Sequence, residues 1–159
     1  MNTKQDYAAR VTYRAASEED YDFLYQMHVA TMKDYVDLTW GWVESDQQSY
    51  FRQNFDPAGL QIIVVDGQDA GMLSIEHQTD EVFLRAIGLL PAYQGGGIGT
   101  YIIRSILEEA RQAGKPVLLY VLKVNPVYNL YQRLGFETVQ ESASHKIMRV
   151  PVKSNEIRP

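Results

Sequence analysis

The segment Gln94-Gly95-Gly96-Gly97-Ile98-Gly99-Thr100 lies between a stretch typical of a β-strand and the start of an amphipathic helix. The first turn of a helix carries N–H groups without intrahelical acceptors and a partial positive charge, so it can hold a phosphate. Glycine removes the side chains that would keep phosphate oxygens away from the backbone. The segment therefore predicts a binding site for a pyrophosphate-containing ligand, with a flexible loop that binds no ligand as the alternative.

The hydrophobic pattern around this segment predicts a succession of strands and helices. Apolar residues recur at helical spacing from Ile98 to Ala110, and Gly114 and Pro116 end that helix. We expect the other elements at these positions: strands at 11–14, 60–65, 70–76, 81–90, 117–122, 136–139 and 146–150, and helices after the N-cap Ser17, at about 45–54 and at 125–134. The aromatic residues 34–55 are expected to be irregular before their helix, with a loop at 39–42. A mixed sheet with helices on both faces accommodates this order.

Two other nucleotide-binding turns fit the segment poorly. A Walker P-loop needs a lysine followed by serine or threonine, and the segment contains no lysine. A dinucleotide fingerprint needs a third glycine where Ile102 stands and an acidic residue after the next strand, which ends in Lys123. Both comparisons leave a coenzyme with a pyrophosphate group as the better expectation.

Two motifs in the same order and spacing make the chain resemble the GNAT superfamily of acetyl-CoA-dependent N-acetyltransferases. Its pyrophosphate motif is matched by Gln94-x-x-Gly97-x-Gly99 after Leu89-Leu90-Pro91, and its next motif by Asn125…Leu130-Tyr131-x-x-x-Gly135-Phe136. The resemblance, which covers about 81–150, implies a single α/β (α+β) domain over 1–159 with a polar tail from about 152. The implied fold is a mixed, mostly antiparallel twisted sheet flanked by helices on both faces.

The resemblance also implies how the chain holds acetyl-CoA. The pyrophosphate would be bound by backbone N–H groups of the whole glycine segment, that is Gln94, Gly95, Gly96, Gly97, Ile98, Gly99 and Thr100. The main chain at Leu89 and Leu90 would pair with the pantetheine arm and polarise the thioester carbonyl, and Asn125 would cap its helix and bind the pantetheine. Gly96 departs from the family, because many members carry Lys or Arg there. The loop consequently has less positive charge and more conformational freedom to lose on binding.

Acetyl transfer to an amine also needs groups that move protons. An amine of pKa about 10.4 is mostly protonated at neutral pH, so a base must accept its proton, and the departing thiolate benefits from an acid. By the resemblance, Tyr131 is the acid and Tyr128 its weaker substitute; a tyrosine that only packs is the alternative. Glu81 is the first choice for the base, ahead of Glu76 and His77. Each of these three is otherwise an ordinary solvated residue near a strand end.

The acceptor pocket is expected in the aromatic segment 35–55. Trp40 and Trp42 would line it and Glu44 would attract a cationic amine, although an aromatic cluster of this kind is more often a minor core. Alternation places Arg85 on the same face of its strand as Glu81, where it would hold a substrate carboxylate, or else pair with Glu81. The acceptor itself stays open: a small-molecule or peptide amine fits equally.

Composition limits the remaining functions. The net charge of −5 gives no support for nucleic acid or an anionic membrane as a partner. The absence of cysteine excludes thiolate metal sites and an acetyl-cysteine intermediate, so transfer is expected to be direct, within a ternary complex, with no metal. Residues 1–10 lack the apolar run of a signal peptide and no stretch approaches the ~20 apolar residues that span a bilayer, so a cytoplasmic enzyme is expected.

Two rival functions share the same fold and motifs. One is a non-catalytic module that senses acyl-CoA, and the other is a transferase of a longer acyl chain. Oligomeric state stays open, and a homodimer is suggested only because dimers are common in this superfamily.

Overall fold

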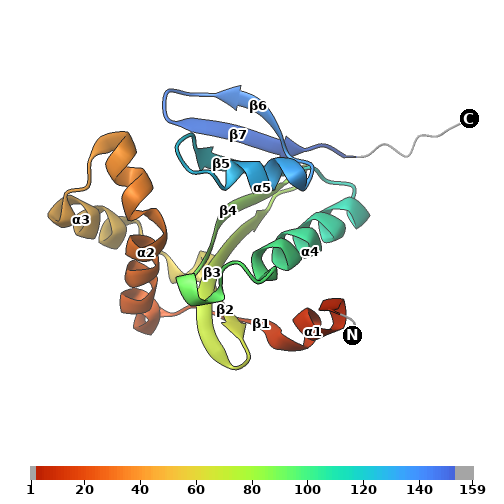
Figure 1. Ribbon diagram of the computed structural model, residues 1–159, viewed down its shortest axis with the longest axis horizontal. Helices are drawn as coiled ribbons and strands as arrows, with labels where there is room; N and C mark the ends of the chain where they lie inside the picture. The colour runs from red at the N-terminus through yellow and green to blue at the C-terminus, as the bar shows by residue number, and fades with distance from the viewer. Residues whose placement is uncertain (1–2, 153–159) are drawn as a thin grey trace, which may run out of the picture. The chain divides into compact units, whose positions relative to one another are not determined.

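The computed structural model describes residues 3–152, including the backbone but not the side chains of 3–5. The polar tail predicted from about residue 152 lies almost wholly outside the described residues. The helices of Figure 1 are α1 (Thr3–Arg10), α2 (Tyr21–Trp40), α3 (Glu44–Asn54), α4 (Ile98–Gln112) and α5 (Tyr128–Arg133), with short 3₁₀ turns at Glu18–Asp20, Pro57–Gly59 and Pro91–Tyr93. The strands are β1 (Val11–Ala15), β2 (Gln61–Val65), β3 (Gln68–His77), β4 (Val82–Leu89), β5 (Val117–Leu122), β6 (Glu137–Glu141) and β7 (His145–Val150).

The strands form one seven-stranded sheet in the order β1-β2-β3-β4-β5-β7-β6. The pairs β1–β2, β2–β3, β5–β7 and β6–β7 are antiparallel, whereas β4 pairs with β5 in parallel. This mixed, mostly antiparallel sheet flanked by helices is the predicted fold. Asp66 and Gly67 both have positive φ, 51° and 80°, which is the turn that the Asp-Gly pair indicates between β2 and β3.

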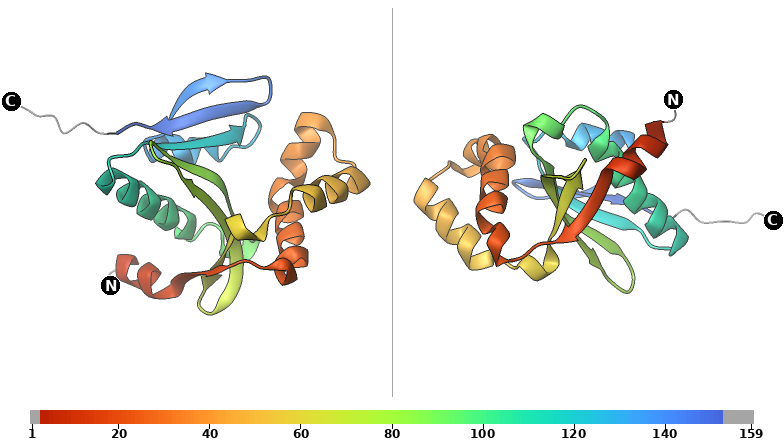
Figure 2. Two further views of the ribbon diagram at one scale, coloured as in Figure 1. Left: turned by 180° about the vertical axis from the view of Figure 1, so that it is seen from behind. Right: turned by 90° about the horizontal axis from the view of Figure 1, so that it is seen from below.

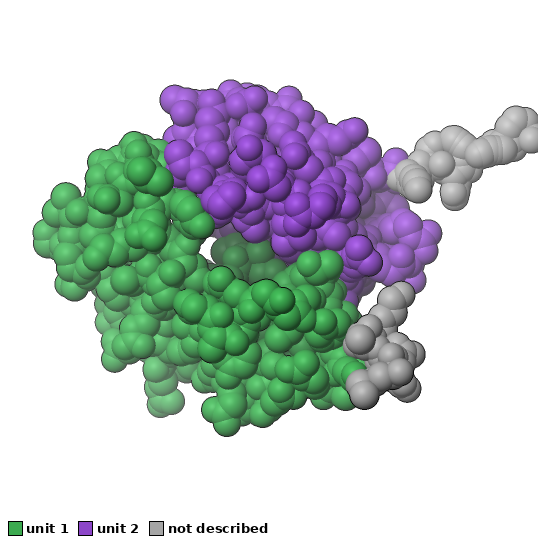
Figure 3. Space-filling model, in the orientation of Figure 1, with its two compact units in different colours: residues 1–74, 86–101 green, residues 75–85, 102–159 purple. Residues whose placement is uncertain are grey.

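The chain divides into two compact units, coloured separately in Figure 3. Unit 1 comprises residues 1–74 and 86–101, and unit 2 comprises residues 75–85 and 102–159. Buried residues of unit 1 include Leu24 and Met27 of α2 and Ile62, Ile63 and Val65 of β2; those of unit 2 include Ile102 of α4, Leu119 of β5, Phe136 and Met148 of β7. The single domain over 1–159 stays a prediction.

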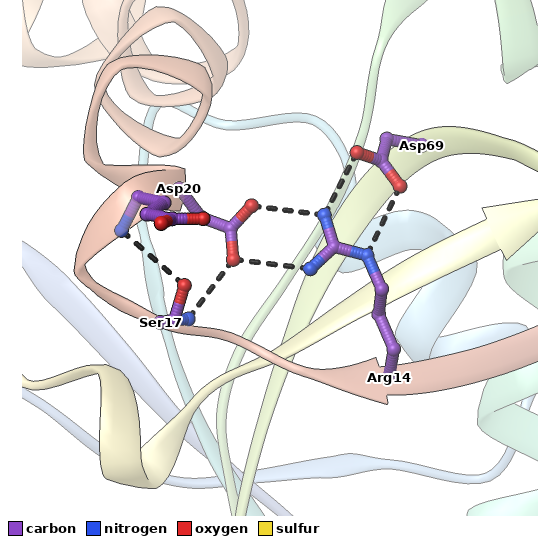
Figure 4. Close-up of polar contacts among 5 residues, drawn as sticks. Arg14, Ser17, Asp20 and Asp69 are labelled. Atoms are coloured by element: carbon purple, nitrogen blue, oxygen red, sulfur yellow. Dashed lines mark hydrogen bonds and ion pairs between the residues drawn. The ribbon is translucent and has the colours of Figure 1, made fainter.

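The 3₁₀ turn Glu18–Asp20, which leads directly into α2, begins at a capping box. The Ser17 hydroxyl accepts a hydrogen bond from the Glu19 N–H, and the Asp20 carboxylate accepts one from the Ser17 N–H (Figure 4). Arg14 of β1 donates to Asp20 at 2.8 and 3.1 Å and also to Asp69 of β3. These bonds lower the pKa of Asp20 and tie the start of α2 to two strands of unit 1.

Two helix boundaries differ from prediction. Residues 34–40, expected to be irregular, continue α2, because tyrosine and tryptophan are tolerated within a helix and the stop comes at Gly41, with φ 87°. The Gly41 N–H bonds to the carbonyl oxygens of Val36 and Asp37. Helix α5 begins at Tyr128 instead of Asn125 and ends at Arg133, since residues 125–127 form a turn before it.

Helix α1 was not predicted. Its sequence carries no apolar stripe, and of residues 6–10 only Tyr7 is half-buried, the others being exposed. Contacts with the rest of unit 1 therefore decide where this helix lies, and a polar segment without periodicity contains no signal of them.

Candidate functional site

The glycine segment lies in unit 1, at the N-terminus of α4. Gly95 and Gly97 have φ of 81° and 87°, a region that residues with a side chain rarely adopt. The first α-helical hydrogen bond runs from the Tyr101 N–H to the Gly97 carbonyl at 2.9 Å. The N–H groups of residues 98–100 consequently have no acceptor within the helix, which is the arrangement that holds anions.

Space around the loop is compatible with a close ligand. A Cβ placed on Gly95 or Gly96 would meet no atom within 4 Å, so open space adjoins both residues. A Cβ on Gly99 would lie 3.7 Å from Leu89 Cδ1, which brings the first turn of α4 against the end of β4. The missing side chains thus leave the backbone accessible at the loop and permit close packing at the helix start.

The main chain at Leu89 and Leu90 is largely engaged within unit 1. The Gln94 side chain donates from Nε2 to the Leu89 carbonyl at 2.8 Å. The Leu90 N–H donates to the Ala70 carbonyl at 2.8 Å, and the Leu90 carbonyl accepts from the Tyr93 N–H at 2.8 Å. The Leu89 carbonyl and both main-chain groups of Leu90 therefore have protein partners, and the side chain of Gln94 supports the loop.

Tyr131 is buried in unit 2. Its relative exposure is 7%, and its ring packs edge-on against Phe136 with centroids 5.6 Å apart. The Phe136 N–H donates to the Tyr131 carbonyl at 3.0 Å, which folds the chain back after Gly135, whose φ is 103°. Burial raises the pKa of Tyr131 to about 12, so its hydroxyl keeps its proton at neutral pH.

Asn125 and Tyr128 lie in the turn before α5 and in its first turn, also in unit 2. The Asn125 Oδ1 accepts a hydrogen bond from the Val127 N–H at 3.0 Å, so this side chain stabilises the turn that leads into the helix. Lys146 places its Nζ 4.9 Å from the centre of the Tyr128 ring, a cation–π contact. Tyr128 is therefore in contact with a cation of β7, whereas Tyr131 packs against Phe136.

The base candidates lie around the β3–β4 turn of unit 2. Glu81 is half-buried, and its carbonyl accepts from the Gln78 N–H at 2.9 Å. Glu76 accepts from Gln78 Nε2 at 2.6 Å and from Arg85 at 3.2 Å, and these bonds lower its pKa. A lowered pKa makes Glu76 a weaker base. The expected pairing of Arg85 with Glu81 is wrong: Arg85 forms its ion pair with Glu76, because β3 and not the turn brings a carboxylate to it.

Trp42, one of the acceptor candidates, belongs to a half-buried aromatic cluster of unit 1, where α2 and α3 lie side by side (Figures 1 and 2). The cluster contains Tyr21, Tyr25, His28, Trp42, Phe51 and Phe55. Glu44 accepts hydrogen bonds from the Tyr25 hydroxyl, Trp42 Nε1 and Gln48 Nε2, and these donors lower its pKa. The outcome is an ionised carboxylate held in a set position. Trp40 is 62% exposed.

The candidate residues thus form separate groups. Within unit 1, hydrogen bonds and packing join Leu89, Gln94 and Gly99, and Glu44 joins Trp42. Unit 2 carries Glu81, Arg85, Asn125 and Tyr131, with Arg85 bonded to Glu76. The residue that sequence reasoning missed is Tyr7 of α1, whose hydroxyl donates to the carbonyl of Gly96. Nothing in the sequence near Tyr7 signals this contact.

Comparison with known proteins agrees with the fold. The model of the acetyltransferase (GNAT) family matches residues 21–136, so the chain belongs to this family. Mycothiol acetyltransferase of Saccharomonospora viridis is 39% identical over 61 residues, which are 37% of this chain and 20% of that protein. The chain therefore matches only about a fifth of the length of this relative.

Solved structures share the fold at low sequence identity. The PaiA N-acetyltransferase of Thermoplasma acidophilum, solved in complex with coenzyme A, has a TM-score of 0.72 at 18% identity, over 89% of this chain and 98% of that one. Arabidopsis thaliana Naa50, in complex with the bisubstrate analogue CoA-Ac-MVNAL, has a TM-score of 0.61 at 13% identity, over 88% and 97%. Both establish the likeness of the fold.

The described residues contain neither a candidate metal site nor a helix that could span a membrane. Among the described residues, no group of three or more histidine, aspartate or glutamate side chains is placed to hold a metal ion. Within residues 3–152, no helix has both the length and the apolar character to cross a bilayer.

Proposed function

We propose that the protein is an N-acetyltransferase that moves an acetyl group from acetyl-CoA to a primary amine by direct transfer in a ternary complex. One observation carries the proposal. The family match over residues 21–136 includes the glycine loop at the start of α4, and the backbone of this loop is suited to binding a phosphate. In that loop two glycines have positive φ and the next helical turn offers N–H groups without intrahelical acceptors.

The substrate acetyl-CoA would be held mainly by backbone groups. The N–H groups from Gly95 to Thr100 would bind the pyrophosphate. The Gln94 N–H already donates to the Pro91 carbonyl at 3.2 Å, so Gln94 acts through its side chain on Leu89. We assign the Leu89 N–H as the donor to the thioester carbonyl, since the Leu89 carbonyl and both main-chain groups of Leu90 form hydrogen bonds within the protein.

The reaction forms one bond and breaks one. The neutral amine attacks the thioester carbonyl carbon, the C–N bond forms, and the C–S bond breaks with the electron pair leaving on sulfur. Tyr131 would give its hydroxyl proton to the coenzyme A thiolate, and the proton lost by the amine would pass to a base. The pKa of about 12 means that Tyr131 is protonated at neutral pH and has a proton to donate, but the raised pKa also makes it a weaker acid than an exposed tyrosine, so the assignment rests on the family motif.

Glu81 remains the first choice for the base. Its rival Glu76 is bonded to Arg85 and has a lowered pKa, which reduces its ability to accept a proton. His77, the last residue of β3, is exposed and is the second choice for the base. A Glu81→Gln variant that retains full turnover at neutral pH would transfer the role to His77.

The acceptor would be a cationic amine before it loses its proton. Glu44 supports this choice, since three donors hold an ionised carboxylate in place on the surface of unit 1. The bisubstrate analogue bound to Naa50 joins coenzyme A to a peptide, and a peptide amine is accordingly the first class of acceptor to try. Small polyamines and amino acids form the second class.

Calorimetric titration with acetyl-CoA is the first test, with coenzyme A, NAD and ATP as controls. We expect micromolar affinity for acetyl-CoA and none of that order for NAD or ATP. Preference for NAD or ATP would refute the proposal. Binding of acetyl-CoA without any amine acetylation that depends on Tyr131 would instead indicate a sensor module.

A further inference from the structure

Helix α1 is attached to the rest of unit 1 through two side chains. Arg10, at its last residue, donates from Nε to both carboxylate oxygens of Asp66 at 3.1 Å, and its carbonyl accepts from the Asp66 N–H at 2.9 Å. Tyr7, one turn earlier, donates its hydroxyl proton to the Gly96 carbonyl and stacks at 5.5 Å on Tyr101 in the first turn of α4. The same helix thus contacts the β2–β3 turn and the glycine loop.

The hydrogen bond from Tyr7 orients one peptide of the loop. A peptide bond is planar and trans, so its carbonyl and its N–H point in opposite directions. Holding the Gly96 carbonyl towards Tyr7 therefore directs the Gly97 N–H away from α1. This peptide lies between glycines, whose φ and ψ are the least restricted of any residue, and it would rotate most freely without such a bond.

Tyr7 also accounts for the glycine at position 97. A Cβ placed on Gly97 would overlap the Tyr7 hydroxyl, whereas a Cβ on Gly96 would meet nothing within 4 Å. The loop therefore excludes a side chain at 97 for two reasons, its φ of 87° and the tyrosine beside it. Position 96 carries neither restriction, because its φ is not positive.

We propose that Tyr7 is a positioning residue for the pyrophosphate site: it fixes the Gly96–Gly97 peptide so that the Gly97 N–H is set for the phosphate before acetyl-CoA arrives. The inference rests on the proposed function. It offsets the departure at Gly96, where many family members carry a cation. A loop that lacks this charge gains affinity if its peptide is already ordered, since less conformational freedom is lost on binding.

The test compares Tyr7→Phe with the wild type and with Tyr120→Phe, which removes the hydroxyl of a tyrosine that is 54% exposed on β5. The ring of residue 7 keeps its contact with Tyr101, so only the bond to Gly96 is lost. Calorimetry with acetyl-CoA should show roughly five-fold weaker binding for Tyr7→Phe, the usual worth of one neutral hydrogen bond. We expect no change for Tyr120→Phe.

A second measurement separates positioning from simple stabilisation. In ¹⁵N relaxation of the ligand-free protein, Tyr7→Phe should make the Gly97 amide more mobile, and acetyl-CoA should restore its order. Arg10→Gln removes the other attachment of α1, the ion pair with Asp66. This variant should have a lower melting temperature and the same affinity for acetyl-CoA as the wild type. A Tyr7→Phe protein that binds as tightly as the wild type, or that loses affinity no more than Arg10→Gln does, overturns the role of Tyr7. If the wild type itself does not bind acetyl-CoA, the proposed function fails and this inference fails with it.

Discussion

The glycine loop of unit 1 and the Tyr131 region of unit 2 are specified in opposite ways. The loop from Gln94 to Gly97 is exposed, and its conformation depends on positive φ angles and on main-chain hydrogen bonds. Tyr131 and Phe136 are 7% and 2% exposed and are held by packing. The loop is therefore sensitive to substitutions that add a side chain to a glycine. The tyrosine region is sensitive to substitutions that remove atoms from a buried side chain.

This contrast separates binding from stability and catalysis. Substitutions in the exposed loop should change the affinity for acetyl-CoA with little effect on folding, because few buried contacts depend on them. Substitutions around Tyr131 should change turnover or the free energy of unfolding with little effect on affinity. The following variants test the contrast, beginning with the largest expected effect.

Tyr131→Phe should lower kcat by a factor of about 10² to 10⁴, the usual contribution of one general acid. The affinity for acetyl-CoA should stay within about two-fold, because the ring and its packing on Phe136 remain. Steady-state kinetics with a good amine acceptor measure the first quantity and calorimetry the second. Tyr128→Phe is the matched control, one turn earlier on α5, and it should lose far less activity; equal losses would contradict the assignment of the acid.

Phe136→Ala should lower the free energy of unfolding by about 3–5 kcal/mol, since it leaves a large cavity beside Tyr131. Chemical denaturation measures the change. Gly96→Ala serves as the comparison, because its methyl group enters open space, and it should shift the free energy of unfolding by less than about 0.5 kcal/mol. Comparable losses in the two variants would remove the contrast between loop and core.

Gly97→Ala should weaken acetyl-CoA binding by a factor of about 5 to 30, since a side chain at positive φ costs about 1–2 kcal/mol and this one also displaces Tyr7, so the free loop leaves the conformation that it must regain on binding. Gly96→Ala, in the same loop and of the same size, should change the affinity less than about three-fold. Calorimetry on both variants decides the matter. If the two weaken binding equally, the loop is sensitive to bulk and not to its backbone conformation.

At alkaline pH, kcat should begin to fall at a higher pH than it would if the acid were an ordinary tyrosine. Burial raises the pKa of Tyr131 to about 12, so the donating form is fully present below about pH 10 and is lost only as the pH rises through about 12. At pH 10.5 an unperturbed tyrosine, with a pKa of about 10, would be mostly ionised. A pH profile of the Tyr131-dependent part of kcat should remain flat to pH 10.5; a midpoint near 10 would show an acid that is exposed.

Gly96→Lys should tighten acetyl-CoA binding by about two- to five-fold, because an exposed cation near a phosphate contributes up to about 1 kcal/mol. The added side chain meets no atom within 4 Å of its Cβ, so the loop can accept it. The gain should shrink when the ionic strength is raised from 0.05 to 0.5 M, as expected for a screened charge. A gain that is independent of salt would point to packing instead of charge.

Much of the fold could be predicted because its signals are local. The β5 strand at Val117–Leu122, the start of α4 at Ile98 and the Asp66-Gly67 turn each follow from residues adjacent in the chain. The ends of α2 and α5 were less well predicted. A helix ends where other main-chain hydrogen bonds replace the helical ones, as at the Gly41 N–H. The aromatic residues of α2 contain no signal of where this happens.

The sequence by itself predicted a glycine-rich turn at residues 94–100 before a helix, and it places Tyr131 before Gly135 and Phe136 at the family's spacing. Those features lie within single motifs, where neighbouring residues set the backbone. The tertiary structure alone decided that Arg85 pairs with Glu76, that burial raises the pKa of Tyr131, and that Tyr7 contacts Gly96, 89 residues away. Partners distant in sequence and the degree of burial depend on how the chain packs, and no local pattern encodes them.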